Sequence, residues 1–313
     1  MKFIKLAQGI ISYIPFSKYL YKERTGRMES ARYCYSVYLR HLMMAYFNGL
    51  NTNPKVIAEL GPGDSLGIGL AALISGGEKF LALDVIKHAK LERNLEVFDE
   101  LITLFKQRSP IPDEKEFPNI HPILQNHSFP SNILDEKRLE NALEKERLEK
   151  IRNSILDSQN KDSPIQYIVP WHDVGNLTKE SVDIILSQAV LEHIEDLPKT
   201  YQAMSLWLKP KGYISHQIDF KCHGTADEWN GHWCYSDFTW KLMKEKKPYL
   251  LNREPLSIHI LLMKKNGFEV VCEKRIRSKS NLKKFLLAPR FKCMSDVDLT
   301  TSGVFIQAVK TKE

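Results

Sequence analysis

The sequence contains no apolar run of the roughly eighteen residues that a membrane-spanning helix needs. It also lacks a recognisable signal-peptide cleavage site near its N-terminus. Its five cysteines are an odd number and include no Cys-x-x-Cys pair, which argues against a disulfide framework and against a structural zinc site. We therefore expect a cytoplasmic protein that holds no metal ion.

The 313 residues suffice for one α/β domain of ordinary size with additions, and 43% of them are hydrophobic. Lysine and arginine outnumber aspartate and glutamate by 45 to 38, which gives a formal net charge of +7. Part of this excess lies between Lys274 and Lys284. Such a cluster can attract an anionic substrate or a membrane surface, although a solvated surface is the simpler interpretation.

A strand followed by a glycine-containing turn begins at Val56 and reads Val-Ile-Ala-Glu-Leu-Gly-Pro-Gly-Asp. Its apolar start is typical of a buried parallel strand, and Gly61 and Gly63 allow a turn in which the backbone passes close to a ligand. A second apolar strand, Phe80-Leu-Ala-Leu, ends on Asp84. A carboxylate in this place can bind ribose hydroxyls, and a helix N-cap is the alternative role for Asp84.

The glycine pattern differs from the dinucleotide fingerprint, because Leu66 stands where its third glycine belongs. Glu59, two residues before Gly61, would place negative charge beside a pyrophosphate. A carboxylate there suits a cationic ligand instead. The pattern therefore disfavours a nicotinamide oxidoreductase and fits S-adenosylmethionine, which carries a positive amino group and a sulfonium.

With these motifs, the chain resembles the class I S-adenosylmethionine-dependent methyltransferases over residues 54–106 and 165–275. The resemblance extends to Trp171-His-Asp-Val-Gly-Asn-Leu and to Ser187-Gln-Ala-Val-Leu-Glu-His-Ile. It implies a Rossmann-like α/β fold with a seven-stranded, mainly parallel sheet and helices on both faces. It also implies the cofactor residues Glu59, Gly61, Gly63, Asp84, Val85, Asp173, Val174 and Ser187. One departure is Ser65, which replaces a glycine usual in the family.

Methyl transfer to a hydroxyl is the predicted reaction, and its candidate catalytic residues follow the fourth and fifth strands. His223 can accept the acceptor's proton while Asp219 orients its ring. His193 is a further candidate, although it can equally fix the geometry of its loop. Alignment of the reactants can supply much of the rate, so no single side chain need be essential.

The segment from His216 to Gly267 is similar to methyltransferases associated with surface-polysaccharide biosynthesis, which implies a glycan or other small hydroxylated acceptor. Trp229, Trp233 and Tyr235 can stack on a sugar ring, and Arg253 can contact a phosphate or carboxylate, with packing as the alternative for all four. A lipid or quinone acceptor at a membrane surface also remains open. Ser187-Gln-Ala-Val replaces the Asn/Asp-Pro-Pro-aromatic motif of nucleic-acid amino-methyltransferases, which disfavours nucleic acid as a partner.

The chain divides into an N-terminal helical cap, residues 1–53, and a methyltransferase domain, residues 54–313, with an insertion at about residues 107–164. Within the cap, residues 1–25 are apolar with flanking lysines and could contact a membrane surface, and a second helix is expected over residues 30–47. A charge-rich helix is expected over residues 134–156 of the insertion. A non-catalytic scaffold that binds a partner through this insertion is the alternative to an enzyme.

Overall fold

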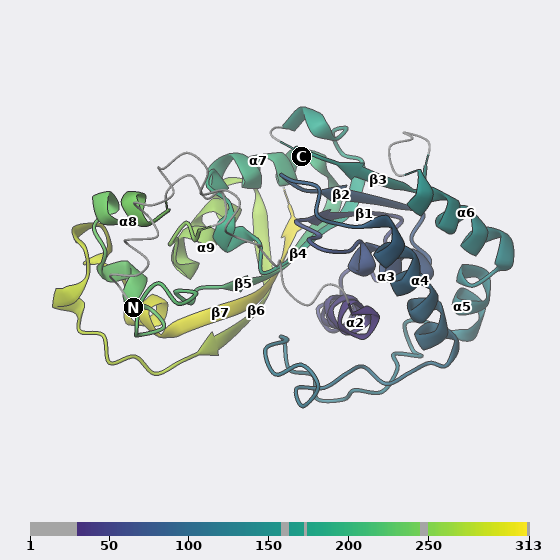
Figure 1. Ribbon diagram of the computed structural model, residues 1–313, viewed down its shortest axis with the longest axis horizontal. Coiled ribbons are helices and arrows are strands. Elements are labelled where there is room, and N and C mark those ends of the chain that lie inside the picture. Colours follow the sequence, from purple (N-terminus) through teal and green to yellow (C-terminus); the bar gives the residue numbers. More distant parts are fainter. Residues whose placement is uncertain (1–29, 158–162, 172–173, 245–249, 312–313) are drawn as a thin grey trace.

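The computed structural model describes residues 30–157, 163–171, 174–244 and 250–311. Seven strands form one sheet in the order β3-β2-β1-β4-β5-β7-β6 (Figure 1). The strands are β1 Val56–Leu60, β2 Lys79–Leu83, β3 Ile165–Ile168, β4 Val182–Gln188, β5 Leu208–Asp219, β6 Phe268–Arg277 and β7 Thr301–Lys310. Only β7 runs antiparallel to its neighbours, β5 and β6. The predicted Rossmann-like, seven-stranded and mainly parallel sheet is confirmed.

Strands β1 and β4 are parallel neighbours. From β1 the chain adds strands towards one edge of the sheet, β2 and then β3, and from β4 it adds them towards the other edge, so the strand order reverses between β1 and β4. In open α/β sheets of this kind, ligands bind outside the carboxyl ends of the strands at such a reversal. The strands are mostly apolar on both faces because helices cover each face. This arrangement places the expected cofactor site where β1 and β4 end.

Helices lie on both faces of the sheet, as predicted. One core contains side chains from α2, α3 and α4, and the other contains side chains from α7 and α9. The helices are α2 Ala31–Phe47, α3 Gly67–Ile74, α4 Leu91–Lys106, α5 Glu136–Ala142, α6 Lys145–Leu156, α7 Leu197–Trp207, α8 Asp237–Lys244, α9 Leu256–Lys265 and α10 Asp296–Thr300. None of those in the described ranges is long and apolar enough to cross a membrane.

Helix α2 matches the expected helix over residues 30–47. Ser30 caps it by accepting a hydrogen bond from the backbone N–H of Tyr33 at 3.3 Å. The helix is buried along most of its length and packs in one core with α3 and α4. This part of the predicted N-terminal cap is therefore integral to the sheet's packing. Residues 1–25, the predicted membrane contact, lie outside the described residues.

The insertion contains two helices where the sequence predicted one. Helix α5 ends at Ala142, and α6 begins after Glu144, whose φ of −56° and ψ of 138° are not helical. Asp135 caps α5 by accepting from the N–H of Arg138. The break lets each short helix turn its own apolar side chains, Leu139 and Ile151 among them, into the core beside α3 and α4. Charge spacing along the helix surface does not reveal such a break.

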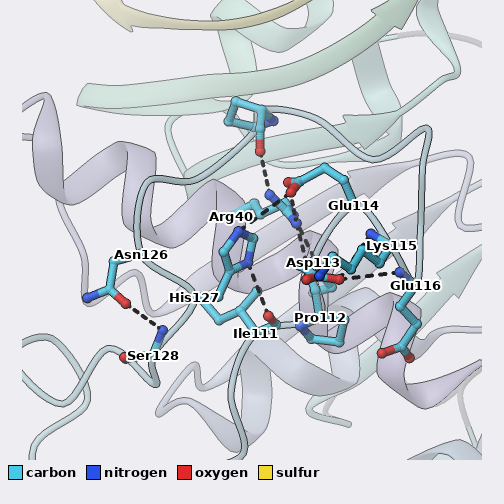
Figure 2. A network of polar contacts seen from close by, with 12 residues as sticks. Arg40, Ile111, Pro112, Asp113, Glu114, Lys115, Glu116, Asn126, His127 and Ser128 are labelled. Atoms are coloured by element: carbon cyan, nitrogen blue, oxygen red, sulfur yellow. Dashed lines mark hydrogen bonds and ion pairs between the residues drawn. The ribbon is translucent and has the colours of Figure 1, made fainter.

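A buried arginine of α2 forms hydrogen bonds with the non-helical first half of the insertion (Figure 2). Arg40 has no exposed surface, and its guanidinium donates to the carbonyl oxygens of Pro122 at 2.6 Å and Pro112 at 2.8 Å. The Glu114 carboxylate lies 3.3 Å from the same group. These bonds fix two separate turns of the insertion on one side chain of the core.

Candidate functional site

The turn between β1 and α3 has the backbone geometry that the glycine motif predicts. Gly61 and Gly63 have φ values of +62° and +70°, in the left-handed region that favours glycine. A Cβ on Gly61 would also lie 2.7 Å from a methyl carbon of Val190, which follows β4. The backbone N–H of Gly61 donates to the carbonyl of Leu83 at 2.8 Å and holds the turn against the end of β2. A side chain at position 61 is therefore excluded twice, by backbone conformation and by space.

Asp84 follows β2 directly and lies beside this turn. Its carboxylate accepts from the backbone N–H groups of Val85 at 2.7 Å and Gly63 at 3.4 Å. Burial raises the pKa of Asp84 above its usual value. Val85 and Ile86 are 43% and 46% exposed, so apolar surface flanks the carboxylate. Helix α4 begins only at Leu91, which shows that Asp84 is not a helix N-cap.

Glu59 lies behind the turn on β1 and is only 1% exposed. One of its carboxylate oxygens, Oε2, has no hydrogen-bond partner. Burial, and then the charge of Asp84, raise the pKa of Glu59 to about 8, although a hydrogen bond from the backbone of Gly69 opposes this rise. A buried acid of this kind is stabilised in its charged form by a nearby cation.

Of three further predicted cofactor residues, two come after β3 in the sequence and one lies within β4. Val174 begins a short 3-10 turn, and its carbonyl accepts from the indole N–H of Trp207 at 2.8 Å. Ser187 is fully buried within β4, where its hydroxyl lies 2.8 Å from Nδ1 of His216. This pairing places the Ser187 side chain between strands. Asp173 lies outside the described residues.

The predicted catalytic residues come together at the carboxyl ends of β4 and β5. Nε2 of His223 lies 3.4 Å from Oδ2 of Asp219, and the rings of His223 and His193 have centroids 5.4 Å apart. Burial raises the pKa of Asp219, but hydrogen bonds from His223 and from the Lys221 amide outweigh it, so this pKa lies below its usual value. Asp219 is therefore ionised at neutral pH and can orient the histidine ring.

The predicted acceptor-binding side chains are mostly engaged in packing. Trp233 is 1% exposed and donates to the carbonyl of Arg253 at 3.0 Å. Arg253 is itself buried, bonded to Asp237 at 2.5 Å and packed over the ring of Trp240. Neither side chain presents a face to an acceptor in this structure, and packing, the alternative role, describes both.

Trp229 and Tyr235 are half-buried, unlike Trp233 and Arg253. The Trp229 indole donates to the carbonyl of Lys279, and the Tyr235 hydroxyl donates to the carbonyl of Thr225 at 2.9 Å. These two aromatic side chains retain some exposed surface beyond β5. Within the described ranges, no group of three or more histidine, cysteine, aspartate or glutamate side chains is arranged to hold a metal ion.

Comparison with protein families gives a match to a family described as "Methyltransferase domain" over residues 109–273, more than half of the 313-residue chain. The chain belongs to this methyltransferase family. The matched region includes β4, the turn that carries His193, and β5. A search of curated proteins finds no match.

Several solved structures of methyltransferases are also similar to this chain, at low sequence identity. An S-adenosylmethionine-dependent methyltransferase from Mesorhizobium loti is 12% identical, with 82% of this chain and 91% of that chain covered and a TM-score of 0.40. Phosphoethanolamine N-methyltransferase 2 from Haemonchus contortus, in complex with S-adenosyl-L-methionine, is 14% identical, with 90% and 57% covered and a TM-score of 0.43. The family assignment rests on the sequence match and agrees with the strand order.

The cofactor of this methyltransferase is S-adenosylmethionine, and the residues at the β1 and β2 ends fit it. The unpartnered carboxyl oxygen of Glu59 suits a positively charged ligand. The turn at Gly61 and Gly63 has no side chains to obstruct an approaching ligand. Asp84 offers an acceptor for ribose hydroxyls, with the apolar surface of Val85 beside it. The protein is thus a methyltransferase enzyme, and the non-catalytic scaffold is rejected.

One residue at the acceptor side was missed from sequence. Glu192, next to His193, is 3% exposed, and neither of its carboxylate oxygens has a hydrogen-bond partner. Burial, and then the charge of Asp219, raise its pKa well above the usual value. The Leu-Glu-His sequence after β4 is the only indication of it in the chain, and a glutamate there is ordinary for a loop. Burial, which sequence does not show, distinguishes it.

Proposed function

We propose that this methyltransferase methylates a hydroxyl group of a saccharide or another small hydroxylated acceptor. The observation that carries the proposal is the His223–Asp219 pair at the end of β5, which only β4 separates from β1 and its glycine turn in the sheet. A histidine beside an ionised carboxylate can take up the proton that a hydroxyl loses on methylation. The half-buried rings of Trp229 and Tyr235 beyond β5 support a ring-shaped acceptor. Similarity to enzymes associated with surface-polysaccharide biosynthesis supports a glycan.

S-adenosylmethionine, when bound, supplies an electrophilic methyl group. Asp219 holds His223 through Nε2, which keeps the proton on that nitrogen and makes Nδ1 the basic one. Nδ1 then takes the acceptor's hydroxyl proton, and Asp219 stabilises the resulting imidazolium. His193, whose ring packs against His223, limits the orientation of that ring.

The test is methyl transfer from labelled cofactor to a panel of glycans and small hydroxylated compounds, with His223→Asn as the variant. Asparagine tolerates the left-handed backbone at position 223, where φ is +45°. We expect kcat to fall about 100-fold or more, while affinity for S-adenosylhomocysteine stays within about twofold. His127→Gln in the insertion is the control and should leave both unchanged. Methylation of amines but not hydroxyls, or undiminished turnover by His223→Asn, would contradict the proposal.

A lipid or quinone acceptor at a membrane surface is supported by one observation. Phe285 is 73% exposed and Leu286 is 51% exposed, directly after Lys283 and Lys284. Exposed apolar side chains next to lysines favour the surface of an anionic membrane. Flotation with anionic vesicles, compared between wild type and Phe285→Ser, tests this second candidate. Equal flotation of the two proteins would count against it.

A further inference from the structure

A cavity of about 490 Å³ lies at the amino-terminal edge of the sheet, opposite the cofactor turn. Its walls come from residues just before β1, residues between α3 and β2, and the insertion helices α5 and α6. These two helices lie on the far side of the molecule from α8 and α9 (Figure 1). The cavity is therefore separate from both the cofactor residues and the proposed acceptor residues.

Positive charge predominates in the walls of this cavity. Four cations line it against two carboxylates: Lys55, Lys137, Arg138 and Arg147 against Glu78 and Asp135. Glu78 pairs with Lys55 at 3.1 Å, and Asp135 accepts from the backbone N–H of Arg138 as a helix cap. Among the described residues, no carboxylate forms an ion pair with Lys137, Arg138 or Arg147.

Backbone carbonyls at the end of α3 hold both guanidinium groups. Arg138 donates through Nε to the carbonyl of Ser75 at 2.7 Å, and Arg147 donates to the carbonyls of Leu73, at 2.9 Å, and Gly77. Nη2 of Arg138 and Nε of Arg147 are buried without an acceptor. Burial lowers the pKa of each arginine from its usual value. The carbonyl bonds alone thus leave the charge of this pair incompletely satisfied.

Helix capping accounts for only part of this arrangement. The carboxyl end of a helix contributes about half a negative charge. Four cations and two carboxylates line the cavity, and the charge of a third carboxylate, Glu144, also acts on Arg147, so an excess of one positive charge is left against the helix end. Lys137 contacts no α3 carbonyl by a hydrogen bond in the described residues. An anion in the cavity would complete the charge balance.

We propose that this cavity binds a small molecule carrying a phosphate or diphosphate group. Arginine and lysine are the side chains that bind phosphate oxygens most often, and arginine matches their geometry. The volume of about 490 Å³ is within the usual range for small-molecule sites, about 300 to 1,000 Å³, and exceeds what a single phosphate fills. Ile133 and Ala142 provide apolar wall for the organic part of such a ligand.

The test is calorimetric titration of the full chain with inorganic pyrophosphate at low salt. Lys137→Gln is the variant, because Lys137 is exposed and holds no part of α3. Lys145→Gln is the matched control, since Lys145 lies on α6 outside the cavity wall, where it pairs with Glu149 at 3.8 Å. We expect Lys137→Gln to weaken pyrophosphate binding about tenfold and Lys145→Gln to change it less than twofold.

The same titration repeated with saturating S-adenosylhomocysteine distinguishes this cavity from the cofactor site. Pyrophosphate affinity should be unchanged when the cofactor site is filled. Three outcomes would overturn the proposal: no binding up to millimolar pyrophosphate, equal affinity in wild type and Lys137→Gln, or competition by S-adenosylhomocysteine. None of these outcomes bears on the proposed hydroxyl methylation.

Discussion

Replacing Glu59 with glutamine should remove a pH-dependent part of the unfolding free energy of the cofactor-free protein. The pKa of Glu59 rises from 4.5 to about 8 in the folded protein. Because the folded state then holds this proton more tightly than the unfolded chain, its contribution to stability is greatest below pH 4.5 and is lost as the pH rises towards 8. At about 1.36 kcal/mol for each pH unit, the full loss is about 5 kcal/mol. Glutamine has a similar shape, and its side-chain amide does not ionise in this pH range.

The measurement is denaturant unfolding of wild type and Glu59→Gln at about pH 5.5 and about pH 8.5. Groups that both proteins share, such as Asp84 and Glu192, cancel in the comparison. Over this interval, we expect the unfolding free energy of wild type to fall by about 3 kcal/mol more than that of the variant. Affinity of the variant for S-adenosylmethionine should also be weaker, because glutamine cannot supply the negative charge that a cationic ligand would stabilise on Glu59. An identical pH dependence in the two proteins would refute the view of Glu59 as a buried, neutral acid.

Two substitutions with matched controls test the turn and the insertion. Gly61→Ala should weaken S-adenosylhomocysteine binding at least tenfold, because its methyl would meet Val190, whereas Gly49→Ala has a similar φ of +68° but open space around it and should leave binding unchanged. Equal calorimetric affinities for the two variants would count against the steric argument. Arg40→Met should lower the unfolding free energy by about 3 kcal/mol, since the buried Pro122 carbonyl loses its arginine donor and the Pro112 carbonyl keeps only the hydroxyl of Ser36, whereas Arg32→Met breaks only an exposed ion pair and should cost less than about 1 kcal/mol. Comparable denaturation midpoints would show that Arg40 does not anchor the insertion.

The strand and glycine turn that carry the predicted cofactor residues could be predicted from sequence because each has a local physical cause. The turn after β1 needs left-handed backbone at Gly61 and Gly63, and only glycine adopts it without strain. The continuous burial of β1 and β2 after their first residues follows from helices on both faces. These requirements act over a few residues, so they are visible in the chain itself.

Long-range packing explains what sequence could not show. Trp233 and Arg253 are typical acceptor-binding residues by type, yet the segment before α8 that carries Trp233 and the segment before α9 that carries Arg253 are hydrogen-bonded to each other. Glu192 is ordinary in sequence and becomes unusual only because the fold buries it beside Asp219. In each case the deciding contacts join residues about twenty or more positions apart. At such positions, residue type alone does not predict whether a side chain is buried.

Helix α3 links the two ends of the sheet at which charge is unbalanced. Near its first turn, the N–H of Gly69 bonds Glu59, and at its last turn the carbonyls bond Arg138 and Arg147. The helix dipole favours a negative group such as Glu59 at the first turn and positive groups such as the two arginines at the last turn. Burial nevertheless outweighs the dipole at the first end, because the pKa of Glu59 is raised. A cation such as S-adenosylmethionine would suit the first end, and the proposed anion site lies at the second end, so we expect the two ligands to bind at opposite ends of α3.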